Sequence, residues 1–364
     1  MQNIRVYKEQ GSPNARENTV KHPPGAAPEP VDRRPQQQMM DLLHGALVTQ
    51  LLVVASEFDV AEILADGPLP VSELALRCGA HQRSLHRLLR ALAAHGVFQE
   101  VEPGAFALTS LAETLRADVP GSVRAWIRFW GIPEKLQAIN SLSYSVRTGR
   151  PAFPHVHGTE WWSHLAAHPE HAEIFNDAMG EMARRVHAVA VESCDLTDVR
   201  RVVDVGGGHG HLLATILPRH PELRATLLDQ PSVVRGAKTV LEAAGVADRV
   251  DLVGGDFFDS VPKGADAYFL SMILHDWDDE QCTTVLGMIR RAMAPDARVV
   301  VIDAIVPEDN APHDGKLRDT VMMALHPGRE RTEAEFTALF AAAGLRHVST
   351  TGLASSTGLL VARA

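Results

Sequence analysis

The stretch VVDVGGGHGHL, residues 202–212, decides the fold of this chain. Its apolar, β-branched start predicts a strand that ends in glycines, and the pattern LLATILPRH after Gly210 predicts a helix. Because glycine has no side chain, backbone N–H groups at such a bend can approach a ligand closely. Asp229 closes the next predicted strand, ATLLD, at the distance where an acidic residue usually binds ribose hydroxyls. The sequence therefore predicts a nucleoside-containing cofactor, with an empty glycine turn as the alternative.

The spacing of the glycines discriminates between cofactors. A dinucleotide fingerprint requires G-x-G-x-x-G/A, but its last position counted from Gly206 falls on His211. The Gly-Lys-Ser/Thr of a P-loop does not occur here either. Asp204 precedes the glycines, and its carboxylate would repel a pyrophosphate but could order the loop around a cationic amino-acid tail. The pattern favours S-adenosylmethionine over NAD.

Length and composition bound the other possibilities. The 364 residues exceed what one hydrophobic core usually serves, so we expect two domains. The net charge of −10 argues against a nucleic acid or an anionic membrane as partner. Three widely separated cysteines fit a reducing cytoplasm. We expect no signal peptide and no membrane span, and we interpret the apolar run LVTQLLVVA at 47–55 as a buried helix.

The first third of the chain predicts an arm and a helical module. Residues 1–35 hold six prolines and no apolar period, so we expect a disordered arm. Three helical patterns then run from Gln36 to Phe98, and FQEVEPGAFALTSLA at 98–112 predicts a hairpin around Pro103-Gly104. Three helices followed by a hairpin are typical of a winged helix, which we place at 36–118.

A winged helix raises the rival hypothesis of a DNA-binding regulator. The candidate recognition helix carries Arg87 and Arg90 on one face. A DNA reader usually shows a richer basic stripe and a basic domain charge. The acidic balance favours a module that packs against a partner subunit.

Residues 119–195 are predicted to be mostly helical and to line a substrate pocket, with a break at 151–157. His164 and His168 have the i, i+4 spacing that can bind zinc on a helix. Pro169 ends that helix, however, and no third ligand is evident in the sequence. We therefore expect no metal site.

From Arg201 onward strand and helix patterns alternate, which predicts an open, mainly parallel α/β sheet for a domain at 196–364. Ligands bind such sheets at the carboxyl ends of the strands. The expected strand ends are polar: Asp204–Gly210, Asp229, Asp256–Phe257, Ser271–His275 and Asp303.

The chemistry centres on LHDWDDE, residues 274–280. His275 directly follows the apolar run YFLSMIL, and imidazole is the side chain best suited to accept a proton near neutral pH. Asp303 ends the next strand, and Glu330 lies in the loop HPGRERTE. Either carboxylate could fix the tautomer of His275 and leave its other nitrogen free as a base. A capping or core histidine is the alternative.

Five motifs follow one another along the chain: DVGGGHGHL, LLDQP, GGDFF, LHDWDDE and PGRERTEAEF. With these motifs in this order, residues 36–364 resemble the S-adenosylmethionine-dependent O-methyltransferases of the caffeate/acetylserotonin type, including bacterial natural-product enzymes. The resemblance implies a Rossmann-like sheet of seven strands whose last strand is antiparallel. It also implies that the N-terminal module dimerises, so that the protein is a homodimer without nucleic-acid or membrane partners.

The resemblance assigns roles to individual residues. Catalysis would involve His275, Asp303 and Glu330, with Asp303 standing where many relatives have Glu. Ser271 stands where many relatives contact the cofactor through Lys or Arg. The cofactor-binding residues implied are Asp204, Gly206, Gly208, Asp229, Gly255, Asp256, Phe257 and Ser271. The substrate chamber would involve Phe153, Trp161, Met179, Met272, Met322 and His326.

The predicted activity is methyl transfer to a phenolic hydroxyl of an aromatic small molecule, with His275 as general base. Two alternatives stay open. The same scaffold could methylate nitrogen or carbon or transfer no methyl at all, or the winged helix could belong to a regulator.

Overall fold

The computed structural model describes residues 34–117, 119–353 and 356–364. The chain separates into two compact units, one up to Ala46 and one from Leu47 to Ala364. All but the last two residues of the predicted arm at 1–35 lie outside the described residues, and Pro35 already begins helix α1 (Pro35–Glu57).

Helix α1 contains the run 47–55, which was predicted to be a buried helix; in that run Val53 and Ala55 are buried and the other residues except Leu47 are half-buried. Its large apolar side chains in the first half are exposed, and only Val53, Ala55 and Ser56 near its end are buried. By length and composition α1 is also the one helix among the described residues that could span a membrane. An apolar helix face left open in a single chain is typical of an interface with a partner.

A small module follows α1. Its helices are α2 (Val60–Ile63), α3 (Val71–Arg77), α4 (Gln82–Ala94) and α5 (Ser110–Glu113), and its strands are β1 (Leu69–Pro70), β2 (Phe98–Glu102) and β3 (Ala105–Leu108). The strands pair antiparallel in the order β1-β3-β2, and the hairpin turns at the predicted Pro103-Gly104. Leu74, Leu89 and Phe106 are fully buried between these elements.

Six helices form the middle of the chain: α6 (Arg124–Trp130), α7 (Pro133–Asn140), α8 (Leu142–Thr148), α9 (Ala152–His157), α10 (Trp161–Ala167) and α11 (Pro169–Ser193). The predicted break at 151–157 is wrong, because α9 occupies 152–157. Proline is accepted in the first turn of a helix, where its missing N–H would have no intrahelical partner, and Pro154 lies there.

All seven strands predicted after Arg201 are present: β4 (Arg201–Val205), β5 (Arg224–Asp229), β6 (Val250–Gly254), β7 (Ala267–Ser271), β8 (Arg298–Ala304), β9 (Arg346–Gly352) and β10 (Thr357–Arg363). They form one sheet in the order β6-β5-β4-β7-β8-β10-β9. The pairs from β6 through β8 are parallel, and the last strand, β10, is antiparallel to both neighbours.

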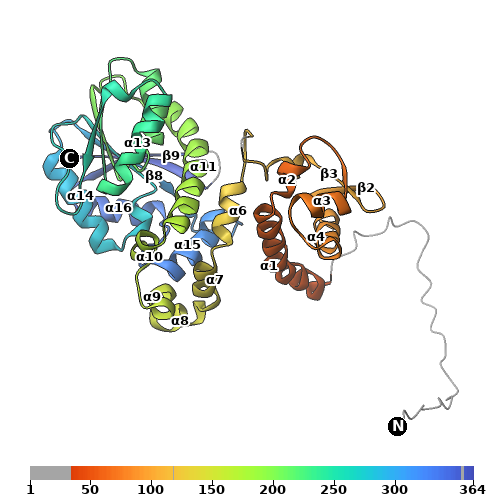
Figure 1. Cartoon of the computed structure of the whole chain (residues 1–364). Coiled ribbons are helices and arrows are strands. Elements are labelled where there is room, and N and C mark those ends of the chain that lie inside the picture. Colours follow the sequence, from red (N-terminus) through yellow and green to blue (C-terminus); the bar gives the residue numbers. More distant parts are fainter. Residues whose placement is uncertain (1–33, 118, 354–355) are drawn as a thin grey trace, which may run out of the picture. The chain divides into compact units, whose positions relative to one another are not determined.

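Helices cover both faces of this sheet (Figure 1). Val299 and Val301 of β8 pack with α14 (Asp279–Ala292) and α16 (Glu333–Ala342). Val300 and Ile302 point to the other face, where α11, α12 (His211–Ile216) and α13 (Pro231–Ala243) pack. Successive strand residues point to opposite faces, so a sheet buried on both sides requires an unbroken apolar run. Because the strands themselves are apolar, the polar side chains of these segments lie at the carboxyl ends of the parallel strands.

Candidate active site

The glycine bend lies between β4 and α12, as predicted. Gly206, Gly208 and Gly210 all have positive φ, between 55° and 79°, a conformation that side-chain-bearing residues rarely adopt. A Cβ on Gly207, which has an ordinary φ, would lie 2.7 Å from Asp204 Oδ2. Glycine is required at this bend because the backbone adopts positive φ and also passes close to the Asp204 side chain.

The Asp204 carboxylate fits the cofactor inferred from the sequence. Asp204 is buried, and its Oδ2 has no hydrogen-bond partner among the described residues. Burial, helped by the charge of Asp229, raises the pKa of Asp204 to about 7. A buried oxygen without a partner requires a donor, and the ammonium group of an amino-acid tail is one. This position is therefore compatible with the tail of S-adenosylmethionine.

The other predicted cofactor residues gather around the same bend. Asp229 ends β5, and its Oδ2 accepts a hydrogen bond from the Gly208 N–H at 2.7 Å. Gly255 donates to the Asp229 carbonyl, and Asp256 accepts from the Phe258 N–H. The Phe257 ring lies 3.6 Å from where a Cβ of Gly206 would stand. The residues predicted from three separate strand ends thus converge.

Ser271 ends β7 beside a residue that the sequence analysis did not identify. The Ser271 hydroxyl lies 2.8 Å from Nε2 of His187, which comes from the long helix α11. His187 is buried, and its Nδ1 has no hydrogen-bond partner among the described residues. Burial, with the nearby His211, lowers the pKa of His187 to about 3, so this ring is neutral.

His275 lies in a short 3₁₀ turn, η3 (Leu274–Asp276), which follows β7. Its Nδ1 lies 3.1 Å from Asp303 Oδ1 and 3.4 Å from Glu330 Oε1, and all three side chains are buried. The His275 backbone N–H also donates to Asp303 Oδ2 at 3.2 Å. The sequence left open which carboxylate is the partner of His275; the structure brings both to the same nitrogen.

Two further groups, the half-buried Asp276 and the buried His326, complete this cluster. Asp276 Oδ1 lies 3.5 Å from His275 Nε2 and also 3.5 Å from His326 Nε2. Burial raises the pKa of Asp276 to about 7 and, with the charge of His275, lowers that of His326 to about 3. Burial also lowers the pKa of His275, but the neighbouring carboxylates outweigh this and raise it well above its usual value. The surrounding carboxylates therefore favour the protonated form of His275.

The motif PGRERTEAEF holds the η3 turn in place. Gly328 packs against the backbone of His275 and Asp276. The fully buried Arg331 donates to the carbonyls of Leu274 at 2.7 Å and Trp277 at 2.8 Å. The intervening Glu330 is paired with Arg318, whose Nε lies 2.9 Å from Glu330 Oε1. Gly328, Glu330 and Arg331 of the motif therefore each have a contact that positions the histidine.

The predicted substrate residues divide into two groups. His326 joins the catalytic cluster through Asp276; Met272 precedes the cluster with φ 55°, a strained conformation typical of functional sites. The Met322 carbonyl accepts the His326 N–H at 3.0 Å in α15 (Asp314–Leu325).

Three predicted substrate residues lie elsewhere. Phe153 and Trp161 are fully buried in an aromatic core cluster, and Met179 packs against it, so their place in the substrate chamber stays a prediction. The neighbouring Trp162 is instead the one that stacks on His326, with ring centroids 5.9 Å apart. Adjacent residues of a helix point in different directions, so the choice between the two tryptophans depends on how α10 packs and not on the local sequence.

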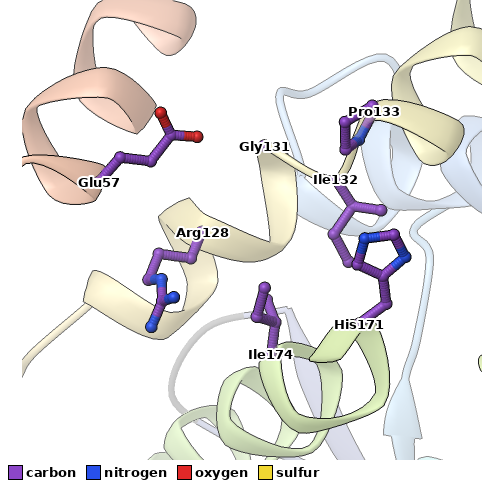
Figure 2. A pocket seen from close by; sticks show the side chains of 7 residues that line it. All are labelled: Glu57, Arg128, Gly131, Ile132, Pro133, His171 and Ile174. Atoms are coloured by element: carbon purple, nitrogen blue, oxygen red, sulfur yellow. The ribbon is translucent and has the colours of Figure 1, made fainter. Parts of the chain in front are cut away.

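A cavity of about 150 Å³ lies between α6, α7 and α11 (Figure 2). It is lined by Glu57, Arg128, Gly131, Ile132, Pro133, His171 and Ile174. No residue of the glycine bend or of the His275 cluster is among them, so this cavity is separate from the candidate active site.

Comparisons with known proteins agree with this geometry. Residues 139–346 match the O-methyltransferase domain family, and residues 40–118 match the O-methyltransferase dimerisation domain. A phenazine O-methyltransferase of Lysobacter antibioticus is 39% identical over 325 residues, which cover 89% of this chain and 95% of that protein. The crystal structure of LaPhzM aligns with a TM-score of 0.86 at 39% identity, covering 90% of this chain and 98% of the other.

Further relatives bear on cofactor and reaction. NcsB1, an O-methyltransferase from neocarzinostatin biosynthesis solved with S-adenosyl-L-homocysteine and 1,4-dihydroxy-2-naphthoic acid, aligns with a TM-score of 0.76 at 33% identity over 87% of this chain and 95% of its own. An 8-amino-8-demethylriboflavin N,N-dimethyltransferase of Streptomyces davaonensis is 35% identical over 87% of this chain and 93% of that protein. The aclacinomycin 10-hydroxylase RdmB of Streptomyces purpurascens is 35% identical over 88% of this chain and 87% of its own length.

Proposed function

This chain belongs to the O-methyltransferase family, and from that premise we propose that it methylates a phenolic hydroxyl of an aromatic small molecule in bacterial natural-product biosynthesis. It is a methyltransferase, and its cofactor is S-adenosylmethionine. The observation that carries the proposal is His275, held between Asp303 and Glu330 at the end of β7. Relatives that act on a phenazine and bind a naphthoic acid support a flat aromatic acceptor.

His275 acts as the general base in this proposal. A phenol has a pKa near 10 and histidine one near 6.5, so full proton transfer costs roughly 5 kcal/mol in water. The carboxylates near Nδ1 reduce the pKa difference between the phenol and His275, because they raise the pKa of His275. They also keep the hydrogen on Nδ1, so that Nε2 receives the proton of the acceptor hydroxyl once His275 has lost its resting proton.

S-adenosylmethionine, when bound, supplies an electrophilic methyl group and leaves as a neutral thioether. The chain's task is to bring the acceptor oxygen to about 3 Å from that methyl and to exclude water, which together contribute several kcal/mol. Trp162 and Met272 are suited to holding a flat ring, because both lie beside the His275 cluster. Asp229 would bind the ribose hydroxyls, and Asp256 and Phe257 would flank the adenine.

His187 and Ser271 would take the carboxylate of the cofactor's amino-acid tail, where many relatives use Lys or Arg. If His187 Nε2 accepts the Ser271 hydroxyl hydrogen, Nδ1 carries the ring hydrogen and is a donor without a partner among the described residues. His187 also lies near His211, directly after the glycine bend. The neutral His187 N–H donor would take the place of the Lys or Arg side chain that many relatives have here.

We also infer a homodimer through α1, which the match to a dimerisation domain supports. Five large apolar side chains of α1 are exposed: Met39, Met40, Leu42, Leu43 and Leu47. A second copy would remove this surface from water.

A second candidate reaction is N-methylation, which the 35% identical N,N-dimethyltransferase favours. A third is a reaction without methyl transfer, because another relative is named a hydroxylase. Incubation with methyl-deuterated S-adenosylmethionine and a matched panel of phenols and aryl amines decides between them by mass spectrometry. We expect label on phenolic oxygen. Label on nitrogen alone would move the proposal to the second candidate, and no labelled product with any acceptor would contradict both.

A further inference from the structure

Histidines gather where α7, α10 and α11 meet, outside the site described above. His164 comes from α10, His171 from α11, and Glu134 from the first turn of α7. We propose that Glu134, His164 and His171 bind a divalent transition-metal ion of the zinc type. This inference does not rest on the proposed methyl transfer.

The three side chains have zinc-like spacing. His164 Nε2 lies 3.1 Å from His171 Nδ1, which lies 3.7 Å from Glu134 Oε2. All three ligand atoms lie within 4.8 Å of one another. Two tetrahedral ligands at about 2.1 Å from zinc are about 3.4 Å apart, between the two measured separations. Two imidazoles and one carboxylate are also ligand types that zinc prefers.

Without a cation the polar atoms of this cluster have too few hydrogen-bond partners. The two imidazole nitrogens that face each other share only one hydrogen bond, and Glu134 Oε2 is a buried atom without a hydrogen-bond partner among the described residues. His164 itself is buried, with 5% of its surface exposed. A metal ion would use all three atoms at once.

Two more histidines support the ligands. His168 stacks on His164 at 4.0 Å between ring centroids, and its Nδ1 lies 2.8 Å from the His164 carbonyl. His157 Nε2 lies 3.0 Å from the Glu134 carbonyl. Outer contacts of this kind fix the position of metal ligands. The sequence analysis expected no metal site at the i, i+4 pair His164 and His168; in the present proposal His164 is a ligand and His168 a supporting residue.

A second group of three metal-type ligands, His275, Asp303 and Glu330, must be distinguished from this one. There the Arg318 guanidinium already lies 2.9 Å from Glu330, and a cation at that distance repels a metal ion. No Arg or Lys is paired with Glu134, His164 or His171 in the ion pairs of the described residues. The charges therefore favour the histidine cluster.

Water would complete the coordination, because His171 lines the cavity of Figure 2 beside Ile132 and Pro133. The ion would link α7 to α10 and α11 through Glu134, His164 and His171. His164 also packs on Phe153, 5.3 Å between ring centroids, so the metal would brace the aromatic core cluster.

The full-length protein should be stripped with a chelator, reloaded with zinc and passed through a desalting column before its metal content is measured. We expect one zinc per chain. With cobalt(II) in place of zinc we expect the visible absorption of a tetrahedral site. His164→Gln and His171→Gln should each weaken zinc binding by more than the 10–100-fold typical of an outer-contact mutation. His168→Gln and His275→Gln are the matched controls, and both should still take up one zinc per chain.

Glu134→Gln guards against a folding defect, because this side chain is partly exposed and keeps its shape. It should weaken zinc binding at least tenfold with an unchanged circular dichroism spectrum. Wild-type protein that takes up no zinc would overturn the proposal. So would zinc uptake or a cobalt spectrum that survives both His164→Gln and His171→Gln, or that disappears in His275→Gln.

Discussion

Gly328 lies so close to His275 that a Cβ on Gly328 would stand 2.0 Å from the His275 carbonyl oxygen. The same Cβ would be 2.7 Å from the Asp276 Cα. These neighbours are backbone atoms, so they cannot turn aside as a flexible side chain can. The loop that carries Glu330 is therefore shaped to receive the η3 turn, which sets the distance between the histidine and its carboxylate.

Gly328→Ala should damage catalysis and stability together. The added methyl must displace η3, and overpacking of this kind typically costs about 1–3 kcal/mol. A shift of the turn by about 1 Å should lower kcat about 100-fold. Urea unfolding and steady-state kinetics measure the two effects. Gly352→Ala is the control, because a Cβ there meets nothing within 4 Å. Wild-type turnover in Gly328→Ala would mean that η3 is not held by this contact.

His275→Gln should separate cofactor binding from chemistry. The residues around the glycine bend are untouched, so we expect an unchanged dissociation constant for S-adenosylhomocysteine by calorimetry. Turnover should fall by about 10²–10⁴, the usual contribution of a general base. His95→Gln, an exposed histidine, is the control. Full kcat in the His275 variant would remove this residue from the mechanism.

The rate should depend on pH through His275, whose pKa lies well above its usual value because Asp303, Glu330 and Asp276 overcome the effect of burial. A protonated ring cannot accept a proton, so kcat/KM should rise with pH above neutrality. Asp303→Asn removes one stabilising charge and should move this rise to lower pH by about 1–3 units. An unmoved profile would show that the rise belongs to another group.

The same pKa shift has a consequence for stability. A group whose pKa is raised on folding stabilises the fold fully below its unfolded pKa, near 6.5, and loses this contribution as pH rises through the folded value. His275 therefore favours folding most at slightly acidic pH, where the rate is lowest.

The strands after Arg201 could be predicted because each is a short apolar run that ends in a polar residue, and the carboxyl ends of parallel strands meet at one edge. Asp204, Asp229 and His275 were placed by that rule alone. Asp303 and Glu330 followed because one ends a strand and the other lies in a charged loop. In each case the signal was local in the sequence.

Side chains whose roles depend on packing between distant helices could not be predicted. His187 reaches Ser271 across 84 positions, and Glu134 reaches His171 from another helix. Trp162 and Trp161 are neighbours with the same chemistry, yet only their orientation decides which stacks on His326. The exposure of α1 belongs to the same class, because it depends on what a second chain covers.

His187→Asn should affect only ligands with an amino-acid tail. If Nδ1 binds the tail carboxylate, affinity for S-adenosylhomocysteine should fall at least tenfold, since a hydrogen bond to a charged group is worth about 1.5–3 kcal/mol. Affinity for 5′-methylthioadenosine, which lacks the tail, should not change. Calorimetry with both ligands measures the difference. An equal loss for both would assign His187 to packing instead.

The buried Lys135 should weaken the fold at neutral pH. It is fully buried, its Nζ has no hydrogen-bond partner among the described residues, and it lies 3.6 Å from the centroid of the Phe129 ring. Burial lowers the pKa of Lys135 well below its usual value. Between the folded and unfolded pKa values the unfolded chain binds more protons, so stability should increase with pH in that range.

Lys135→Met keeps the approximate volume of the side chain and removes its titratable amine. We expect the free energy of unfolding at pH 7 to rise by about 1–3 kcal/mol, because the variant no longer has to give up a proton and bury an amine without a hydrogen-bond partner when it folds. The increase in stability between pH 7 and pH 10 should shrink with it. Urea unfolding at both pH values measures this, with the exposed Lys238→Met as control. A Lys135 variant less stable than wild type at pH 7 would mean that the ammonium is retained and that its contact with the Phe129 ring outweighs desolvation.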